Sequence, residues 1–319
     1  NRSTEQRNAQ VLHTEIMKMK LLSTMVLICA LAPEARVDAD DDVGGFPESL
    51  YHSKQEPFRS FPCLPRRLHI AQASNVLDGG LVNMTVTFSL EYEKCKFTIP
   101  SVIYGHDLVA IGSVRGSHPL QFNYTSDKSH GIFQSDWIYH VQLPNLQAGP
   151  RHHWYRIVVE EERSQPVAWH RSLRGSGGYY LGETKTYPFL TPPLPHSPTT
   201  LALVGDVGQT QNSLRTMVNI YQATRNTTSK YPPVTQLLIA GDMSYADSDP
   251  YRWISWMELM EPLVRTTSVH VAAGNHEIEC DAVNYDIFVQ YEHYFRNPNR
   301  SGPAKTEPVD NDYRQTLWN

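Results

Sequence analysis

The fold is decided by three apolar stretches, each followed by a glycine and a polar residue: Leu201-Ala-Leu-Val-Gly-Asp206, Gln236-Leu-Leu-Ile-Ala-Gly-Asp242 and Ser268-Val-His-Val-Ala-Ala-Gly-Asn275. Continuous apolar runs of this length, bounded by glycine, are typical of buried β-strands. The three stretches therefore predict three strands, and each strand is expected to end in a polar cluster.

The intervals between these strands have helical spacing. Apolar residues recur at i, i+3, i+4 and i+7 in both intervals, namely Leu214, Met217, Val218 and Tyr221, then Trp253, Trp256, Met257 and Met260. An alternation of strand and helix predicts a parallel sheet with helices on its faces. Ligands of such sheets bind beyond the carboxyl ends of the strands, so the three polar clusters are expected to meet at one edge.

The residue types in these clusters indicate a metal site. Asp206, Asp242, Tyr245 and Asn275 offer oxygen atoms, and His276 offers an imidazole. Oxygen ligands suit hard cations, and the neighbouring glycines let the backbone turn sharply beside a ligand. A single aspartate at a strand end is more often a turn former or a helix cap. Three such clusters in order favour a functional site.

The motifs GD-x-G, GD-x-x-Y and GNH-E, at Asp206, Asp242 and Asn275, resemble the metal-site motifs of the purple acid phosphatases. These enzymes are a group within the metallophosphoesterases, whose first motif normally reads D-x-H. Gly208 stands where that histidine is expected, and Tyr245 follows Asp242 by three. Both departures mark the purple acid group. The resemblance implies an α/β metallophosphoesterase domain of α-β-β-α architecture.

The resemblance also implies a ligand set and a reaction. Asp206, Asp242 and Tyr245 would bind Fe(III), while Asp242 and Asn275 would bind a divalent metal (Zn, Mn or Fe). One carboxylate can bridge two cations, and a metal-bound hydroxide would attack a phosphate monoester. His276 would stabilise the phosphoryl oxygens or protonate the leaving group. A structural role for His276 is the alternative.

The family's remaining histidine ligands, from V-x-x-H and G-H-x-H motifs, are not found after His276, where His293 is the only further histidine. His293 falls in a helix predicted over residues 281–295 and is interpreted as a surface residue. The second half of the domain is thus expected to be missing, and the chain as given is expected to be inactive. Two other functions stay open: another metallophosphoesterase, such as a phosphodiesterase or pyrophosphatase, or an inactive product acting as a binding module.

The N-terminal sequence predicts secretion. Residues 17–39 combine Met17-Lys-Met-Lys, an apolar run and small residues near Ala39, which is typical of a signal peptide and too short for a membrane span. Residues 1–16 are interpreted as lying upstream of the true start. The expected location is extracellular, or the lumen of a vacuole or lysosome. Glycosylation sequons begin at Asn83, Asn123, Asn226 and Asn299.

Residues 60–191 predict a β-sandwich, because alternating strands are separated by turn residues. The expected strands include residues 69–73, 81–90, 101–104, 137–143 and 154–159. This region resembles the fibronectin-type-III-like domain that precedes the catalytic domain in large purple acid phosphatases. The matching pieces include Pro100-Ser-Val-Ile-Tyr-Gly, Trp137-Ile-Tyr-His and Phe189-Leu-Thr-Pro-Pro. A proline-rich linker at 191–198 places the start of the catalytic domain (198–319) at its end.

Composition limits which partners the chain is expected to bind and how its cysteines can pair. The net charge is −5 with no basic block, which argues against nucleic acid as a partner. Outside the signal peptide the cysteines are Cys63, Cys95 and Cys280. Because their number is odd, one thiol stays free, pairs between chains or pairs with a residue outside this sequence. Monomer and homodimer both stay open, and so does the natural substrate.

Overall fold

The computed structural model describes residues 61–77, 79–107, 109–149, 151–162, 180–225 and 232–297. The predicted signal peptide and the sequons at Asn226 and Asn299 lie outside these residues. In the part of the chain that is described, the helices are too short or too polar to traverse a lipid bilayer.

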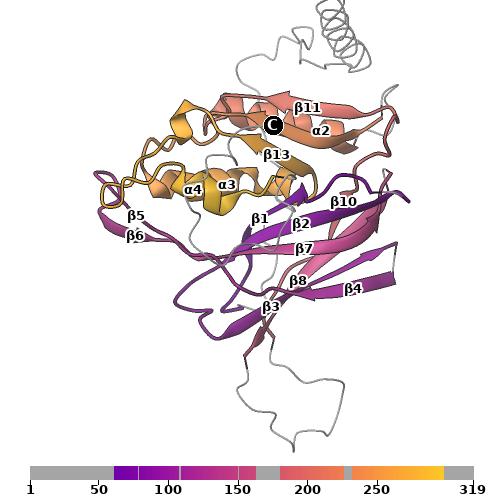
Figure 1. Ribbon diagram of the computed structural model, residues 1–319, viewed down its shortest axis with the longest axis horizontal. Helices are drawn as coiled ribbons and strands as arrows, with labels where there is room; N and C mark the ends of the chain where they lie inside the picture. Colours follow the sequence, from indigo (N-terminus) through magenta and orange to yellow (C-terminus); the bar gives the residue numbers. More distant parts are fainter. Residues whose placement is uncertain are drawn as a thin grey trace, which may run out of the picture.

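The first half of the chain is built of strands (Figure 1). They are β1 (Arg66–Gln72), β2 (Leu81–Leu90), β3 (Thr98–His106), β4 (Val109–Arg115), β5 (Asn123–Ser126), β6 (Gly131–Gln134), β7 (Trp137–Gln147), β8 (His152–Glu161), β9 (Tyr180–Glu183) and β10 (Tyr187–Leu190). The strands expected from the alternating sequence are confirmed. Val82, Met84, Val86 and Phe88, which share one face of β2, are fully buried.

The second half alternates strands with helices, as the sequence predicts. Its elements are β11 (Thr200–Val204), α2 (Gln211–Arg225), β12 (Val234–Ala240), α3 (Pro250–Val264), β13 (Ser268–Ala272), the short 3₁₀ helix η3 (Asn275–Glu277) and α4 (Val289–Tyr294). Helix α3 begins where Asp249 accepts a hydrogen bond from the Tyr251 N–H, and Pro250 occupies the first turn. Both are favourable start signals. The predicted apolar faces of α2 and α3 contribute Met217, Tyr221, Trp253 and Trp256 to the core.

The two halves share one sheet. Its strand order is β11-β12-β13-β1-β2-β7, in which β11 to β13 are parallel and β1 runs parallel to β13 through the pair Ile70 and Ser268. Strands β2 and β7 continue the sheet in antiparallel order. The sequence predicts two domains divided at 191–198, whereas in space the sheet passes from one region to the other without a break. Local periodicity shows which face of a strand is buried, but not which strand lies at its edge.

The strands of the first half belong to two sheets that pack against each other. Strands β10-β8-β3-β4, with β9 beside β8, form the second sheet, and its apolar side chains share one core with β1, β2 and β7. Tyr104, Tyr155 and Phe189 come from the second sheet, and Leu68, Val86 and Leu143 come from the first. The α/β half has its own core between the sheet and its helices, and the β5–β6 hairpin joins that core (Figure 1).

The predicted helix over residues 281–295 is wrong in its first half. Only α4 is helical, and the preceding turns are held by Asp281, whose carboxylate accepts hydrogen bonds from the backbone N–H groups of Thr125, Val283 and Asn284. An aspartate that binds nearby backbone donors competes with helix formation. His293 is also not a plain surface residue: it is half-buried, its ring lies 4.8 Å from the Phe122 ring, and its Nδ1 lies 2.6 Å from the Val289 carbonyl oxygen.

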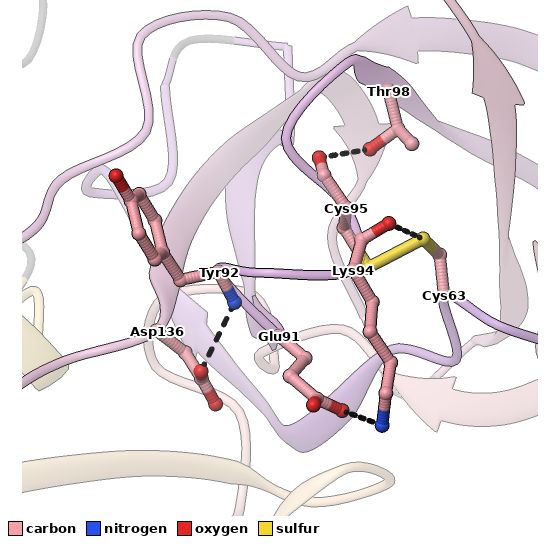
Figure 2. The surroundings of a disulfide bond; sticks show 7 residues. All are labelled: Cys63, Glu91, Tyr92, Lys94, Cys95, Thr98 and Asp136. Carbon is pink, nitrogen blue, oxygen red and sulfur yellow. Dashed lines mark hydrogen bonds and ion pairs between the residues drawn. A yellow bond between two sulfur atoms is a disulfide. The ribbon is translucent and has the colours of Figure 1, made fainter.

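Cys63 and Cys95 form a disulfide, while Cys280 is exposed and unpaired within the described chain. The bond ties the segment before β1 to the turn between β2 and β3 (Figure 2). Two further bonds stabilise that turn. Lys94 Nζ donates to Glu91 Oε2 at 2.8 Å, and the Thr98 hydroxyl donates to the Cys95 carbonyl at 2.9 Å. The Cα atoms of the two cysteines are 5.5 Å apart, within the normal range.

Removal of this disulfide is expected to lower the stability of the sandwich. The two cysteines are 32 residues apart, and closing a loop of that length stabilises a fold by about 3.7 kcal/mol. The double variant Cys63→Ser/Cys95→Ser should show this loss in the free energy of unfolding by urea. Cys280→Ser, at an exposed position, is the matched control and should change stability by less than about 0.5 kcal/mol. Equal denaturation midpoints for all three proteins would contradict the expectation.

Candidate active site

The ends of β11, β12 and β13 meet at one edge of the sheet, as the sequence predicts. The loop after β11 lies on the loop after β12, because the backbone N–H groups of Asp206, Val207 and Gly208 donate to the carbonyls of Gly241, Asp242 and Met243 at 2.8–3.2 Å. Close approach explains a glycine here: a Cβ on Gly274 would lie 2.2 Å from Asp242 Oδ1. The Asp242 carboxylate therefore sits where only a glycine leaves room for it.

Unusual backbone conformations concentrate at this edge. Five of the thirteen non-glycine residues with positive φ in the described chain belong to it: Asp206, Asp242, Tyr245, Asp247 and Ser248, with φ between 50° and 71°. Left-handed backbone is sparsely populated for such residues and persists where surrounding contacts hold it. Clusters of this kind are typical of functional sites.

Asp206 and Tyr245 are in direct contact. The Tyr245 hydroxyl donates a hydrogen bond to Asp206 Oδ1 at 2.7 Å. This hydrogen bond, together with desolvation and the negative charges nearby, raises the pKa of Tyr245 to about 12. Asp242 lies on the neighbouring loop, and its Oδ1 accepts the backbone N–H of His276 at 3.0 Å. The edge therefore gathers three hard oxygen donors from two loops.

His276 is oriented by Asp247. The Nδ1 atom of His276 lies 2.6 Å from Asp247 Oδ1, and this hydrogen bond raises the pKa of the imidazole. The ring also lies against Tyr245, with 4.4 Å between the ring centroids. Because Nδ1 is engaged by the carboxylate, Nε2 is the nitrogen that remains for a substrate. Asp247 thus has an orienting role that the sequence alone did not assign.

Glu277 is a residue of this edge that the sequence did not indicate as a functional candidate. Its buried carboxylate accepts the backbone N–H groups of Asp242 and Gly274 at Oε2 (2.8 and 2.7 Å) and that of Met243 at Oε1 (2.9 Å). Burial raises the pKa of Glu277, and the three hydrogen bonds oppose that rise. It therefore ties the loop after β12 to the loop after β13. The only sequence signal was its place directly after the Gly-Asn-His motif.

Glu279 is a second buried glutamate that joins segments near this edge, namely the loop after β12, helix α3 and helix α4. Its carboxylate accepts from the Ser248 N–H at 3.0 Å, from Trp253 Nε1 at 2.7 Å and from Gln290 Nε2 at 2.9 Å. Burial raises its pKa to about 7. Asn275, the remaining candidate ligand, is exposed at the start of η3, and its carbonyl accepts the Ile278 N–H.

A cavity of about 590 Å³ opens beside Asp206 and Tyr245, between the loop after β11 and the first turn of α2. Polar side chains line it, including Gln209, Thr210, Asn212, Ser213 and Arg252. Gln209 fixes one wall, because its amide donates to the carbonyls of Ser244 and Arg252. The cavity has room for the part of a substrate that is not bound at the carboxylates.

The donor set fits one hard cation well and a second only in part. Asp206, Asp242 and Tyr245 present oxygen atoms of the kind that hard cations prefer, and two of these oxygens already lie 2.7 Å apart. A second ion would have Asp242 and Asn275 alone. The described residues hold no group of three or more histidine, cysteine, aspartate or glutamate side chains arranged for a metal ion.

Comparison with known proteins agrees with this geometry. Residues 199–315 match the model of the calcineurin-like phosphoesterase family. The chain is 27% identical to purple acid phosphatase 22 of Arabidopsis thaliana over 215 residues, covering 67% of this chain and 38% of that protein. It is 35% identical to purple acid phosphatase 21 of the same plant over 177 residues, covering 54% of this chain and 33% of the relative.

A solved structure shows the same fold. The purple acid phosphatase from yellow lupin (Lupinus luteus) seeds superposes with a TM-score of 0.55 at 18% identity, covering 75% of this chain and 42% of that one. In each of these three comparisons the chain spans about two fifths or less of the length of the protein that it matches.

Proposed function

We propose that the site of this chain serves the hydrolysis of phosphate monoesters at a binuclear Fe(III)–divalent metal centre. The premise is that residues 199–315 match the calcineurin-like phosphoesterase family and that the chain is similar to plant purple acid phosphatases. The observation that carries the proposal is the contact of Tyr245 with Asp206, beside Asp242 at the same sheet edge. The divalent ion would be Zn, Mn or Fe.

The residues of the chain have separate roles in this proposal. Asp206, Asp242 and Tyr245 would hold the ferric ion, and Asp242 and Asn275 would contribute to the second. When bound, the two ions supply Lewis acidity and positive charge for a phosphate ester. His276 is held through Nδ1 by Asp247, and its Nε2 would stabilise the phosphoryl oxygens or donate a proton to the leaving oxygen. The cavity beside Asp206 receives the alcohol part.

The proposed location of the enzyme rests on the N-terminal sequence. Secretion, or delivery to a vacuolar or lysosomal lumen, rests on residues 17–39, and the sandwich is proposed to be of the fibronectin-type-III kind. Of the two described sequons, Asn123 is exposed, whereas Asn83 is half-buried and its Oδ1 accepts the Asn145 N–H at 2.9 Å. Asn123 is therefore the better candidate for a glycan.

A phosphodiesterase or pyrophosphatase of the wider family is the alternative enzyme, and Tyr245 favours the purple acid type over it. A non-enzymatic binding module is the other alternative. Hydrolysis of a simple aryl phosphate monoester, measured beside the corresponding diester, separates the first two. The absence of iron binding would favour the third, whereas the absence of turnover alone would not, because the chain as given is expected to be inactive.

Replacement of Tyr245 by phenylalanine is expected to abolish the visible absorption of the iron-loaded protein and to weaken iron binding more than tenfold. Phenylalanine keeps the ring against His276 and removes only the oxygen ligand, so the fold should be retained. Loss of a metal ligand or its support typically costs at least about one order of magnitude in affinity. Iron content and visible spectra measure both effects.

The matched control for this prediction is Tyr285→Phe, at a tyrosine with 78% of its surface exposed. It should leave the spectrum and the iron content unchanged. A folded Tyr245→Phe protein with the full absorption band would refute the assignment of Tyr245 as a ligand.

A further inference from the structure

The β5–β6 hairpin belongs to the first half of the chain but packs into the second. Tyr124 and Phe133 are buried in the same core as Trp253 of α3. The Tyr124 hydroxyl donates to the Cys280 carbonyl at 3.2 Å, and the Thr125 carbonyl accepts the Ala282 N–H at 2.8 Å. The hairpin is therefore firmly seated beside the loop that follows η3 (Figure 1).

The end of this hairpin reaches the loop that carries Tyr245. The Ser126 hydroxyl donates to the Ser248 carbonyl at 2.6 Å. Lys128 Nζ donates to the Asp247 carbonyl, also at 2.6 Å. These two side chains thus bind consecutive carbonyls of a loop that is more than a hundred residues away in sequence.

The loop they bind is the most strained part of the site. Tyr245, Asp247 and Ser248 all have positive φ, of 50°, 51° and 71°, within four consecutive positions. Such conformations need external contacts to persist. From its inner side the loop is held by Glu279, which accepts the Ser248 N–H. From its outer side it is held by Ser126 and Lys128.

We infer that the β5–β6 hairpin is a positioning element of the active site, in which Ser126 and Lys128 hold the 245–248 loop in its left-handed form. In that form the Tyr245 hydroxyl reaches Asp206 and the Asp247 carboxylate reaches His276. Neither hairpin residue touches substrate, and each acts through the loop. The catalytic part of this inference rests on the proposed function, whereas the conformational part stands on the contacts alone.

The test measures the loop directly, by hydrogen–deuterium exchange of the chain in the Ser126→Ala/Lys128→Met double variant. Both positions are at the surface or half-buried, so the fold should survive. Exchange in peptides covering residues 243–249 is expected to become at least fivefold faster, while peptides from β12 stay unchanged. Lys128→Arg keeps a cationic donor, so in this single variant the 243–249 peptides should retain most of their protection from exchange.

Ser113→Ala/Lys94→Met is the matched control, since both residues are exposed and lie on β4 and the disulfide turn. It should leave the 243–249 peptides unchanged. Unaltered exchange in the Ser126→Ala/Lys128→Met protein would overturn the inference.

Kinetics then separate positioning from direct binding. With an aryl phosphate, positioning predicts that kcat falls at least tenfold while KM changes less than threefold. A rise in KM with kcat retained would mean that Lys128 contacts the substrate, and would overturn the inference. If the unmodified protein binds no iron, the proposed function fails, yet the exchange measurement still decides whether the hairpin holds the loop.

Discussion

Acidification from pH 7 to pH 5 is expected to remove several kcal/mol of the free energy of unfolding. The cause is a set of buried imidazoles, whose pKa values burial lowers from 6.5 to about 4 at His69, His270 and His293, and well below 6.5 at His140. At pH 5 each of the three histidines with a folded pKa of about 4 contributes a loss of about 2 kcal/mol, since one pKa unit equals about 1.4 kcal/mol, and His140 acts in the same direction. Together these losses approach the total stability of a typical domain, about 5–15 kcal/mol.

The direction of the effect follows from proton binding. Unfolded histidines take up a proton below pH 6.5, whereas the folded ones do so only near pH 4, so unfolding binds protons between these values. The stability contributed by the neutral folded histidines is therefore complete above pH 6.5 and is lost as the pH falls toward 4.

Two buried carboxylates act in the opposite sense. Glu279 has a pKa of about 7 and Glu277 has a raised pKa, so the folded protein holds these protons more tightly than the unfolded chain does. Their contribution is complete below pH 4.5 and is lost as the pH rises through about 7 for Glu279. His276 acts with them, because its pKa is also raised. Burial lowers the pKa of five histidines in all, His153 included, so a net loss of stability in acid is expected.

Urea unfolding at pH 7 and pH 5 measures how the free energy of unfolding changes with pH. His270→Gln should reduce the difference between the two pH values by about 2 kcal/mol, because one excluded imidazole is removed. His196→Gln, at an exposed loop position, is the control and should leave the difference as it is. Equal unfolding midpoints at both pH values in the unmodified chain would show that these histidines are not excluded from protonation.

The histidines also point to the part that acid should loosen first. His69 on β1 and His140 on β7 flank Thr87 in one cross-strand row. His140 is bonded to the His293 carbonyl of α4, and His69 lies against Phe295. Protonation of His69 and His140 would place positive charge between α4 and the sheet, so their contact is expected to weaken. Ligands of the folded state add stability by mass action, so bound metal would offset part of the loss.

Replacement of Glu277 by leucine is expected to lower the free energy of unfolding by about 4 kcal/mol and to abolish the metal site. Three backbone N–H groups, of Asp242, Met243 and Gly274, would lose their acceptor. An unsatisfied buried donor costs about 1–3 kcal/mol. The carboxylate also joins the loop of Asp242 to the loop of Asn275, beside the bond from the His276 N–H to Asp242 Oδ1.

Glu277→Gln separates the charge from the shape. Its carbonyl can keep the two N–H groups at Oε2, but its amide would then direct a donor at the Met243 N–H, so a loss of about 2 kcal/mol is expected. Glu258→Gln, on the exposed face of α3, is the matched control. Urea unfolding and iron binding measure the outcomes. Full stability in Glu277→Leu would show that the loops are held by other contacts.

The sequence determined the strands, the helices and the chemistry at the sheet edge. The apolar runs before Asp206, Asp242 and Asn275 and the helical spacing between them are local patterns, and the periodicity of 2 or 3.6 residues reports on burial of each element. Parallel strands then bring their carboxyl ends together by geometry. For this reason the sequence by itself predicts that Asp206 and Tyr245 lie at the same edge of the sheet.

Tertiary structure alone decided the contacts between segments distant in sequence. The pairing of β1 with β13, the bond of Cys63 to Cys95 and the seating of the β5–β6 hairpin on the 245–248 loop have no local signature. The same holds for Glu277 and His293, whose burial depends on what covers them. Side-chain periodicity shows that a face is buried, but the identity of its neighbour is set by packing of the whole chain.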